Sequence, residues 1–105
     1  MAKYLLAFHG GSMPETEAEQ AKAMQAWGAW YTGLGGAVVD PGNPIGQIRT
    51  IATDGSASAG GGANPVSGYT ILQADSLDAA VKLASSCPIL ASGGSIEVGE
   101  TYEVM

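Results

Sequence analysis

The chain passes twice through the order strand, helix, strand, and this repeat constrains its fold more than any other feature. Each half opens with a segment that is apolar on both faces, as a strand in the middle of a sheet is: residues 3–8 and 69–74. Each half closes with a short or alternating segment that suits the edge of a sheet: residues 37–40 and 95–104. This pattern predicts an α+β fold of the ferredoxin-like βαββαβ type, with the opening strands central and both helices on one face.

Both predicted helices begin at capping residues and end at residues that break helices. Two consecutive capping-box sequences, residues 12–15 and 16–19, precede apolar residues at helical spacing, and glycines end this helix near residues 33 to 35. The second helix opens at residues 75–78 and ends at Cys87-Pro88, because the residue before a proline is driven out of helical geometry.

The segment between the two halves is rich in small residues. Residues 48–53 alternate weakly, which indicates a further short strand that turns at Asp54-Gly55. Residues 55–65 consist of Gly, Ser, Ala and Asn before a final Pro. This composition predicts a flexible glycine-rich loop inside a single domain of residues 1–105.

Charge and cysteine content exclude several classes of function. The chain has four Lys or Arg against ten Asp or Glu, which argues against nucleic acid or an anionic membrane as a partner. One Cys and one His cannot make a disulfide framework or a transition-metal site, so we expect no metal and no cofactor. No apolar run approaches the roughly 20 residues of a membrane helix, and the start does not resemble a secretory signal. With the unpaired Cys87, these features predict a cytoplasmic protein.

The first strand also predicts a partner. Its alternation places Leu5 and Ala7 on one face and Tyr4, Leu6 and Phe8 on the other, and neither set is polar. Two helices on one face of the sheet leave the other apolar face to be covered. A second copy of the chain is the simplest cover, so we predict a homodimer whose sheets pack face to face.

Several local features together resemble one known family. Residues 65–80 run from a Gly-Tyr strand start into an Ala-Asp-Ser-Leu-Asp-Ala-Ala helix start, and Cys87-Pro88 and residues 95–98 follow at the expected spacing. With Tyr4-Leu5-Leu6 and a first helix that bears tryptophans, the chain resembles the YCII-related and DGPF-domain family over nearly its whole length. The resemblance implies a single YCII-like domain with the dimeric α/β-barrel fold.

The resemblance also bears on the site. The resemblance to YCII-like members implies an active site made of a His and Asp pair in the cleft between sheet and helices, with the His on the first helix. That helix contains no His here, whereas Asp40 matches the Asp of the family. The Asp-Gly-Pro-Phe signature is replaced by Asp54-Gly55 and the residues that follow it.

His9 and Asp40 are the candidate catalytic residues. His9 is the only histidine and stands where the first strand meets a Gly-Gly turn, so it is either a general acid or base or a surface imidazole that bonds the turn. Asp40 precedes Pro41-Gly42 at a strand end and is either its carboxylate partner or an ordinary turn former.

Four further residues are candidate ligand contacts. Trp27 and Tyr31 share the apolar face of the first helix, where aromatic residues form either core or the wall of a pocket. Arg49, the only arginine, can bind a carboxylate or lie exposed on a strand. Tyr69 begins the strand predicted at residues 69–74. The glycine runs lack the pattern of a phosphate-binding loop.

Two hypotheses of function follow. The chain is either a small cofactor-independent enzyme that moves protons between His9, Asp40 and a small metabolite in the dimer cleft, or a non-catalytic module that binds a small molecule or a protein there. The sequence contains no complete catalytic constellation, and it leaves open whether the protein is an enzyme.

Overall fold

A computed structural model of the chain describes residues 1–12 and 14–104. Its elements, in chain order, are β1 (Ala2–His9), α1 (Glu17–Leu34), β2 (Val38–Asp40), β3 (Arg49–Ile51), β4 (Ala57–Ala59), β5 (Val66–Ala74), α2 (Leu77–Ala84) and β6 (Ser95–Glu100). Short 3-10 turns follow the two helices, at Gly35–Ala37 and Pro88–Leu90.

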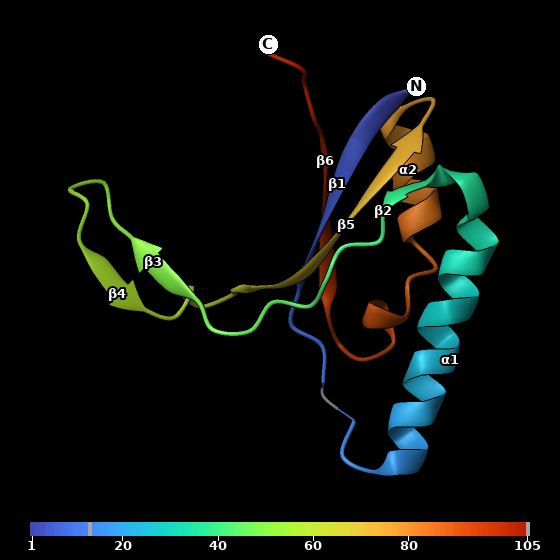
Figure 1. Cartoon of the computed structure of the whole chain (residues 1–105), viewed down its shortest axis with the longest axis horizontal. Helices are drawn as coiled ribbons and strands as arrows, with labels where there is room; N and C mark the ends of the chain where they lie inside the picture. The colour runs from blue at the N-terminus through green and yellow to red at the C-terminus, as the bar shows by residue number, and fades with distance from the viewer. Residues whose placement is uncertain (13, 105) are drawn as a thin grey trace.

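Four strands form one antiparallel sheet in the order β2-β5-β1-β6, with the two longest strands in the middle (Figure 1). β1 pairs with β5 from Ala2↔Ala74 to His9↔Val66, and with β6 from Tyr4↔Glu100 to His9↔Ser95. The predicted α+β class, with a four-stranded sheet and two helices, is therefore confirmed.

Side-chain caps fix where the helices begin. The Thr16 hydroxyl accepts a hydrogen bond from the Glu19 amide at 3.1 Å, and the Ser76 hydroxyl accepts one from the Ala79 amide at 3.1 Å. Gly35 ends α1 with a φ of 54°. This position lies within residues 33 to 35, where the end of the helix was predicted. α2 ends at Ala84, three residues before the predicted Cys87, because Pro88 starts a separate 3-10 turn.

The core lies between the helices and one face of the sheet. Tyr4, Leu6 and Phe8 of β1 are buried there, as the alternation of the strand predicts. A group of aromatic rings joins α1 to this face, and the Trp30 indole donates to the Leu83 carbonyl of α2 at 3.2 Å. Both helices therefore pack on the same side of the sheet.

The opposite face of the sheet is apolar at its centre, and the helices do not cover it. It presents Leu5, Ala7 and Ile71, of which Leu5 is 39 % exposed, together with the exposed Val39. We call this surface the open face.

β3 and β4 form a separate hairpin, which confirms one prediction and corrects another. The short strand predicted at residues 48–53 is β3, whereas the predicted flexible loop at residues 55–65 contains β4. The turn supplies the reason: Asp54 accepts hydrogen bonds from the amide and the hydroxyl of Ser56, at 2.9 and 2.7 Å. These bonds lower the pKa of Asp54. They also hold the turn between β3 and β4, so the two strands pair although the side chains of β4 are small.

The last strand is also shorter than predicted. β6 ends at Glu100 rather than Val104, and Tyr102 and Val104 are exposed. The ladder between β6 and β1 ends at the pair Tyr4↔Glu100, and beyond it the Thr101 amide still donates to the Lys3 carbonyl. Among the helices described, neither has the length and apolar character that crossing a membrane requires.

Candidate functional site

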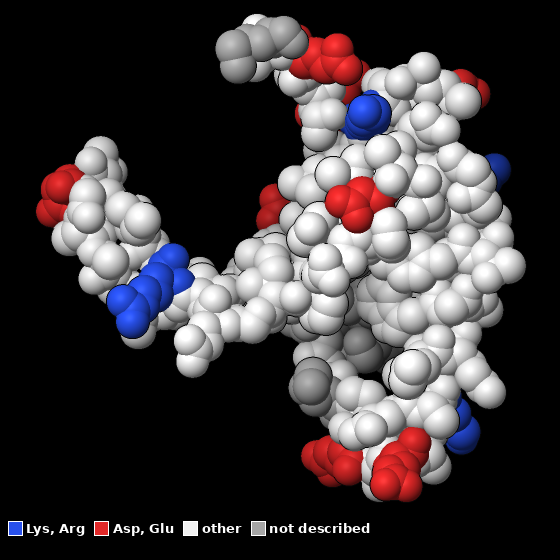
Figure 2. Space-filling model, viewed as in Figure 1, with Lys and Arg blue, Asp and Glu red and all other residues white. Residues whose placement is uncertain are grey.

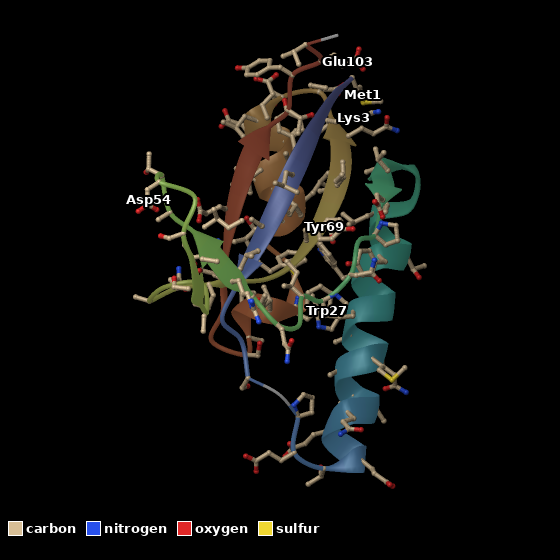
Figure 3. The ribbon with its side chains drawn as sticks, turned by 60° about the vertical axis from the view of Figure 1, so that its left-hand side comes forward. Met1, Lys3, Trp27, Asp54, Tyr69 and Glu103 are labelled. Atoms are coloured by element: carbon tan, nitrogen blue, oxygen red, sulfur yellow. The ribbon has the colours of Figure 1, made fainter. Side chains whose placement is uncertain are left out.

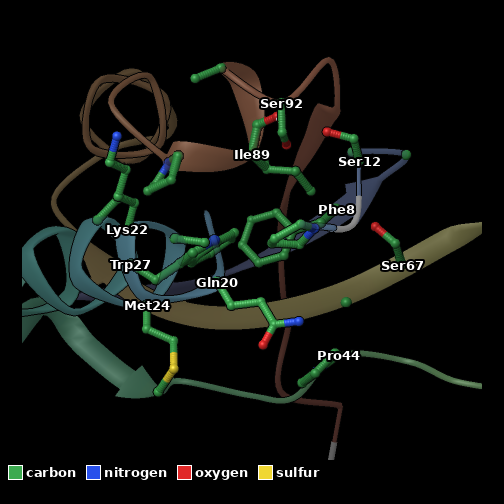
Figure 4. A pocket seen from close by; sticks show the side chains of 18 of the residues that line it. Phe8, Ser12, Gln20, Lys22, Met24, Trp27, Pro44, Ser67, Ile89 and Ser92 are labelled. Carbon is green, nitrogen blue, oxygen red and sulfur yellow. The ribbon is translucent and has the colours of Figure 1, made fainter. Parts of the chain in front are cut away.

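A cleft of about 950 Å³ opens between α1 and the end of the sheet (Figure 4). Its walls come from four places: the end of β1 and the glycines after it, the first half of α1, the segment between β2 and β3, and the beginning of β5. The 3-10 turn after α2 closes it with Ile89. Segments far apart in the sequence thus meet around one hollow.

Aromatic rings form one wall of the cleft. The centroids of Phe8 and Trp27 lie 5.4 Å apart with their planes at 71°, and those of Trp27 and Tyr31 lie 6.0 Å apart. These separations are typical of favourable edge-to-face and tilted aromatic pairs. Trp27 is only partly buried, so a ring surface is available to a ligand.

The hydroxyl of Tyr31 is held in the wall. It lies 2.8 Å from the Thr70 hydroxyl, and both hydroxyls lie 3.0 Å from the Pro41 carbonyl oxygen. Burial raises the pKa of Tyr31, so the phenol is neutral at physiological pH. Tyr31 therefore offers the cleft its ring, while its hydroxyl fastens α1 to β5.

Ser67 places a polar atom in the cleft. Phe8 pairs with Gly68 and His9 pairs with Val66, so Ser67 is the extra residue of a β-bulge. A bulge re-aims a side chain, and the Ser67 hydroxyl points into the cleft (Figure 4). Its oxygen is buried and has no hydrogen-bond partner among the described residues. Such a group is costly to leave unpaired, and a ligand removes the cost if the wall moves enough to uncover the oxygen and let the two bond.

Asp40 fixes the turn that forms the next wall. Its carboxylate accepts a hydrogen bond from the Gly42 amide at 2.8 Å. Gly42 has a φ of 70°, and a Cβ there would stand 1.8 Å from the Tyr69 carbonyl oxygen, so only glycine fits. In this geometry Asp40 acts as a turn former.

His9 lies on the open face, away from the cleft. Its Nδ1 is 3.0 Å from the Asn64 carbonyl oxygen, and its Nε2 is 2.8 Å from a carboxylate oxygen of Glu97 on β6. The second contact is close enough for an ion pair but lacks hydrogen-bond geometry. The His9 side chain is 11 % exposed and that of Glu97 is 77 % exposed, so the pair lies at the rim of the sheet.

The sheet does not bring His9 and Asp40 together. Asp40 pairs with Ile71, which pairs with Leu5, so His9 lies two strands across and four residues along. At strand spacings this is about 10 Å across and about 13 Å along. The pairing of His9 with Asp40, which the sequence left as one of two alternatives, is therefore not formed within the chain, because the two residues end different stretches of the sheet. The carboxylate beside His9 is Glu97.

The four predicted ligand contacts do not all lie at the cleft. Trp27, Tyr31 and Tyr69 line the cleft, whereas Arg49 lies exposed on β3 outside it. The sequence analysis missed Glu97 and Ser67. Aligning the closing strand antiparallel to the first strand, as in a ferredoxin-like sheet, would have placed Glu97 near His9. Ser67 depends on the bulge, for which Gly68 is the only signal.

No metal site and no reactive thiol accompany the cleft in the described part of the chain. Three or more His, Cys, Asp or Glu side chains do not gather anywhere among residues 1–12 and 14–104. Cys87 is only 3 % exposed, and burial raises the pKa of its thiol to about 11, so the thiol is neutral and packed in the core.

Comparison with known proteins adds no relative: no protein-family model matches the chain, and a search of the curated proteins finds no match. The chemistry of the cleft and of the open face therefore has to carry the functional argument.

Proposed function

We propose that this protein binds a small, flat, uncharged molecule in the cleft between α1 and the sheet. The observation that carries the proposal is an aromatic wall of Phe8, Trp27 and Tyr31 facing the same hollow as the unpaired hydroxyl of Ser67. Ligand pockets typically measure roughly 300–1,000 Å³ and combine apolar walls with a few fixed polar groups. In such a site the rings bind the body of the ligand, and Ser67 fixes its orientation.

The charges around the cleft favour an uncharged ligand. Among the described residues, the charged side chains that line it are Glu19 and Lys22, which are exposed and opposite in sign. The space-filling view shows acidic side chains side by side at the lower end of the body, with a basic side chain beside them, and the other charges dispersed (Figure 2). A charged ligand would lose its hydration without gaining a counter-ion, which is costly.

A bulky side chain in the cleft tests this proposal. The neutral fluorescent probe N-phenyl-1-naphthylamine carries two aromatic groups and one N–H donor, which match the walls and Ser67. We expect the probe to bind, and Ala23→Phe, which fills the cleft from α1, to weaken binding about tenfold or more. Ala21→Phe is the matched control, because Ala21 lies on the same helix, exposed and outside the cleft. Equal affinity in both variants would contradict the proposal.

A second candidate function is proton transfer at His9. The observation in its favour is the mostly buried imidazole with a carboxylate oxygen of Glu97 2.8 Å away, since a carboxylate at this distance can orient an imidazole for proton transfer. This enzyme needs no cofactor and takes Glu97 in the role first given to Asp40. Any turnover of a small metabolite should be lost in His9→Ala and reduced in Glu97→Gln, and turnover that persists in His9→Ala refutes it.

The family and the assembly belong to the same proposal. The sheet places the second strand of each half on an edge and antiparallel to its neighbour, which supports a ferredoxin-like domain, the fold that the resemblance to YCII-related proteins implies. The open face with Leu5 and Ile71 supports a homodimer of the dimeric α/β-barrel kind, in which two sheets pack face to face. Light scattering at micromolar concentration tests the dimer, and a stable monomer refutes it.

A further inference from the structure

The β3–β4 hairpin stands away from the rest of the molecule. We call residues 45–65 the arm. All of its residues are exposed except Ile48 and Gly61, which are half-buried. The arm projects from the sheet on the side opposite the helices, with Asp54 at its tip and Tyr69 near its root (Figures 1 and 3).

The two faces of the arm differ in chemistry. The pairs Arg49↔Ala59 and Ile51↔Ala57 point to one face, and the pair Thr50↔Ser58 points to the other. The first face is therefore apolar apart from Arg49, yet Ile51 is 72 % exposed. This alternation is that of a strand with one buried face, and no described part of the chain covers it.

The arm is too small to be stable alone. It contains three residue pairs, held by its turn and by the Thr50 hydroxyl, which donates to the Gly60 carbonyl at 2.7 Å. An isolated two-stranded hairpin is marginally stable in water. A surface that covers the Ile51 face would supply the burial that the arm lacks.

The molecule exposes more surface than a compact domain of its size. Its accessible surface is 7255 Å², against about 5,400 Å² expected for a compact chain of 10.5 kDa. Its radius of gyration is 15.1 Å, against about 13 Å expected for this length. The excess of about 1,800 Å² exceeds the roughly 800 Å² that each partner buries in a typical stable interface.

We infer that the arm clasps a second copy of this chain, with the Ile51 face packed on the partner. The inference rests on the proposed dimer and names a contact that face-to-face sheets alone do not supply. The arm projects on the side of the open face, so a second copy docked there lies beside it (Figure 3). A two-fold axis then places each arm along the other protomer.

Charge favours the same partner. The chain carries a net charge of −6, and the arm sets its only arginine, Arg49, on the apolar face. The open face holds the exposed carboxylate of Glu97, which shares its face with Ala7. When Arg49 of one copy lies beside the Glu97 carboxylate of the other, their attraction offsets part of the repulsion between two negatively charged chains.

Two charge variants of the arm test the clasp. Ile51→Asp places a carboxylate on the inner face, and Ser58→Asp places the same charge on the outer face. Both sites are exposed, so both variants should fold as the wild type does. By sedimentation velocity across a concentration series, we expect Ile51→Asp to raise the dimer dissociation constant about tenfold or more and Ser58→Asp to change it less than about threefold.

A third variant separates the arm from the sheet. Leu5→Asp charges the centre of the open face and should abolish the dimer by itself. If the wild type dimerises and Leu5→Asp is monomeric, but Ile51→Asp and Ser58→Asp behave alike, the clasp is wrong and the sheet dimer stands. If the wild type is a monomer at 100 µM or about that concentration, both are wrong.

Discussion

Replacing Ser67 by alanine should make the protein more stable and a poorer binder. The Ser67 oxygen is buried without a hydrogen-bond partner among the described residues, and such a group costs about 1–3 kcal/mol of folding free energy. Ser67→Ala removes this penalty. We expect the free energy of unfolding to rise by about 1 kcal/mol, which raises the Tm of a domain of this size by about 4–8 °C.

The same substitution removes the polar group that a ligand would bond. We expect the affinity for N-phenyl-1-naphthylamine to fall about two- to tenfold, the equivalent of one net hydrogen bond. Opposite signs in stability and affinity are typical of a residue kept for function at the expense of stability.

Ser92→Ala is the control for this experiment. Ser92 also lines the cleft, but its hydroxyl donates to the Ile89 carbonyl at 3.0 Å, so its loss should lower the unfolding free energy by about 0.5–1.5 kcal/mol. Urea unfolding followed by circular dichroism measures both variants. If Ser67→Ala is destabilised as much as Ser92→Ala, Ser67 is a structural serine and the reasoning is refuted.

Three further predictions concern the groups around the cleft and in the core. Thr70→Val keeps the shape of a fully buried residue but takes a hydroxyl from the Tyr31 and Pro41 bonds, so urea unfolding should show a loss of about 1–3 kcal/mol; no loss would contradict that network. Asp40→Asn should keep the turn at Gly42 and Asp40→Ala should lose about 0.5–1 kcal/mol, whereas equal losses would point to a role for the charge itself. Because burial raises the pKa of Cys87 from 9.0 to about 11, the folded state binds the proton more tightly, so its stability should fall as pH rises from 9 to 11. Cys87→Ala should fall less steeply over that range in urea unfolding at each pH, and identical slopes would contradict it.

The elements that the sequence predicted correctly are those that local chemistry determines. Thr16 and Ser76 start helices because their hydroxyls cap free amides, and Gly35 ends one because its φ is positive. The alternation of Tyr4, Leu6 and Phe8 predicted that these side chains share one face, and that face is the one that the helices cover. Each of these depends on a few neighbouring residues, which a sequence displays directly.

The errors arise where partners are distant in the chain. β4 consists of Ala57, Ser58 and Ala59, whose composition is that of a loop, and it is paired by a turn at Asp54. Trp27 and Tyr31 line the same cleft because one helix face carries both. Asp40 was considered as a partner of His9 because of its residue type, whereas the register of β1 and β6 places Glu97 beside His9. The β-bulge at Ser67 is one residue long, and it places Ser67 at the cleft.

The cleft and the arm share their backbone. The chain leaves the sheet for the arm through Pro41–Pro44 and returns through Ser67–Tyr69, and both segments line the cleft. The two segments are tied together at the root, where the Ile45 amide donates to the Ser67 carbonyl and the Tyr69 amide to the Asn43 carbonyl. His9 adds a third tie by contacting Asn64, at the returning end of the arm.

A docked arm would hold both segments of this root in place, and they are the walls that carry the Ser67 hydroxyl and the Pro41 carbonyl. Ordering a wall before the ligand arrives reduces the entropy lost on binding, so docking and ligand binding should favour one another. Such coupling is reciprocal: whatever factor the dimer adds to ligand affinity, the ligand adds to dimer affinity. We therefore expect the cleft and the arm, which face opposite sides of the sheet, to act on one another through the short root that joins them.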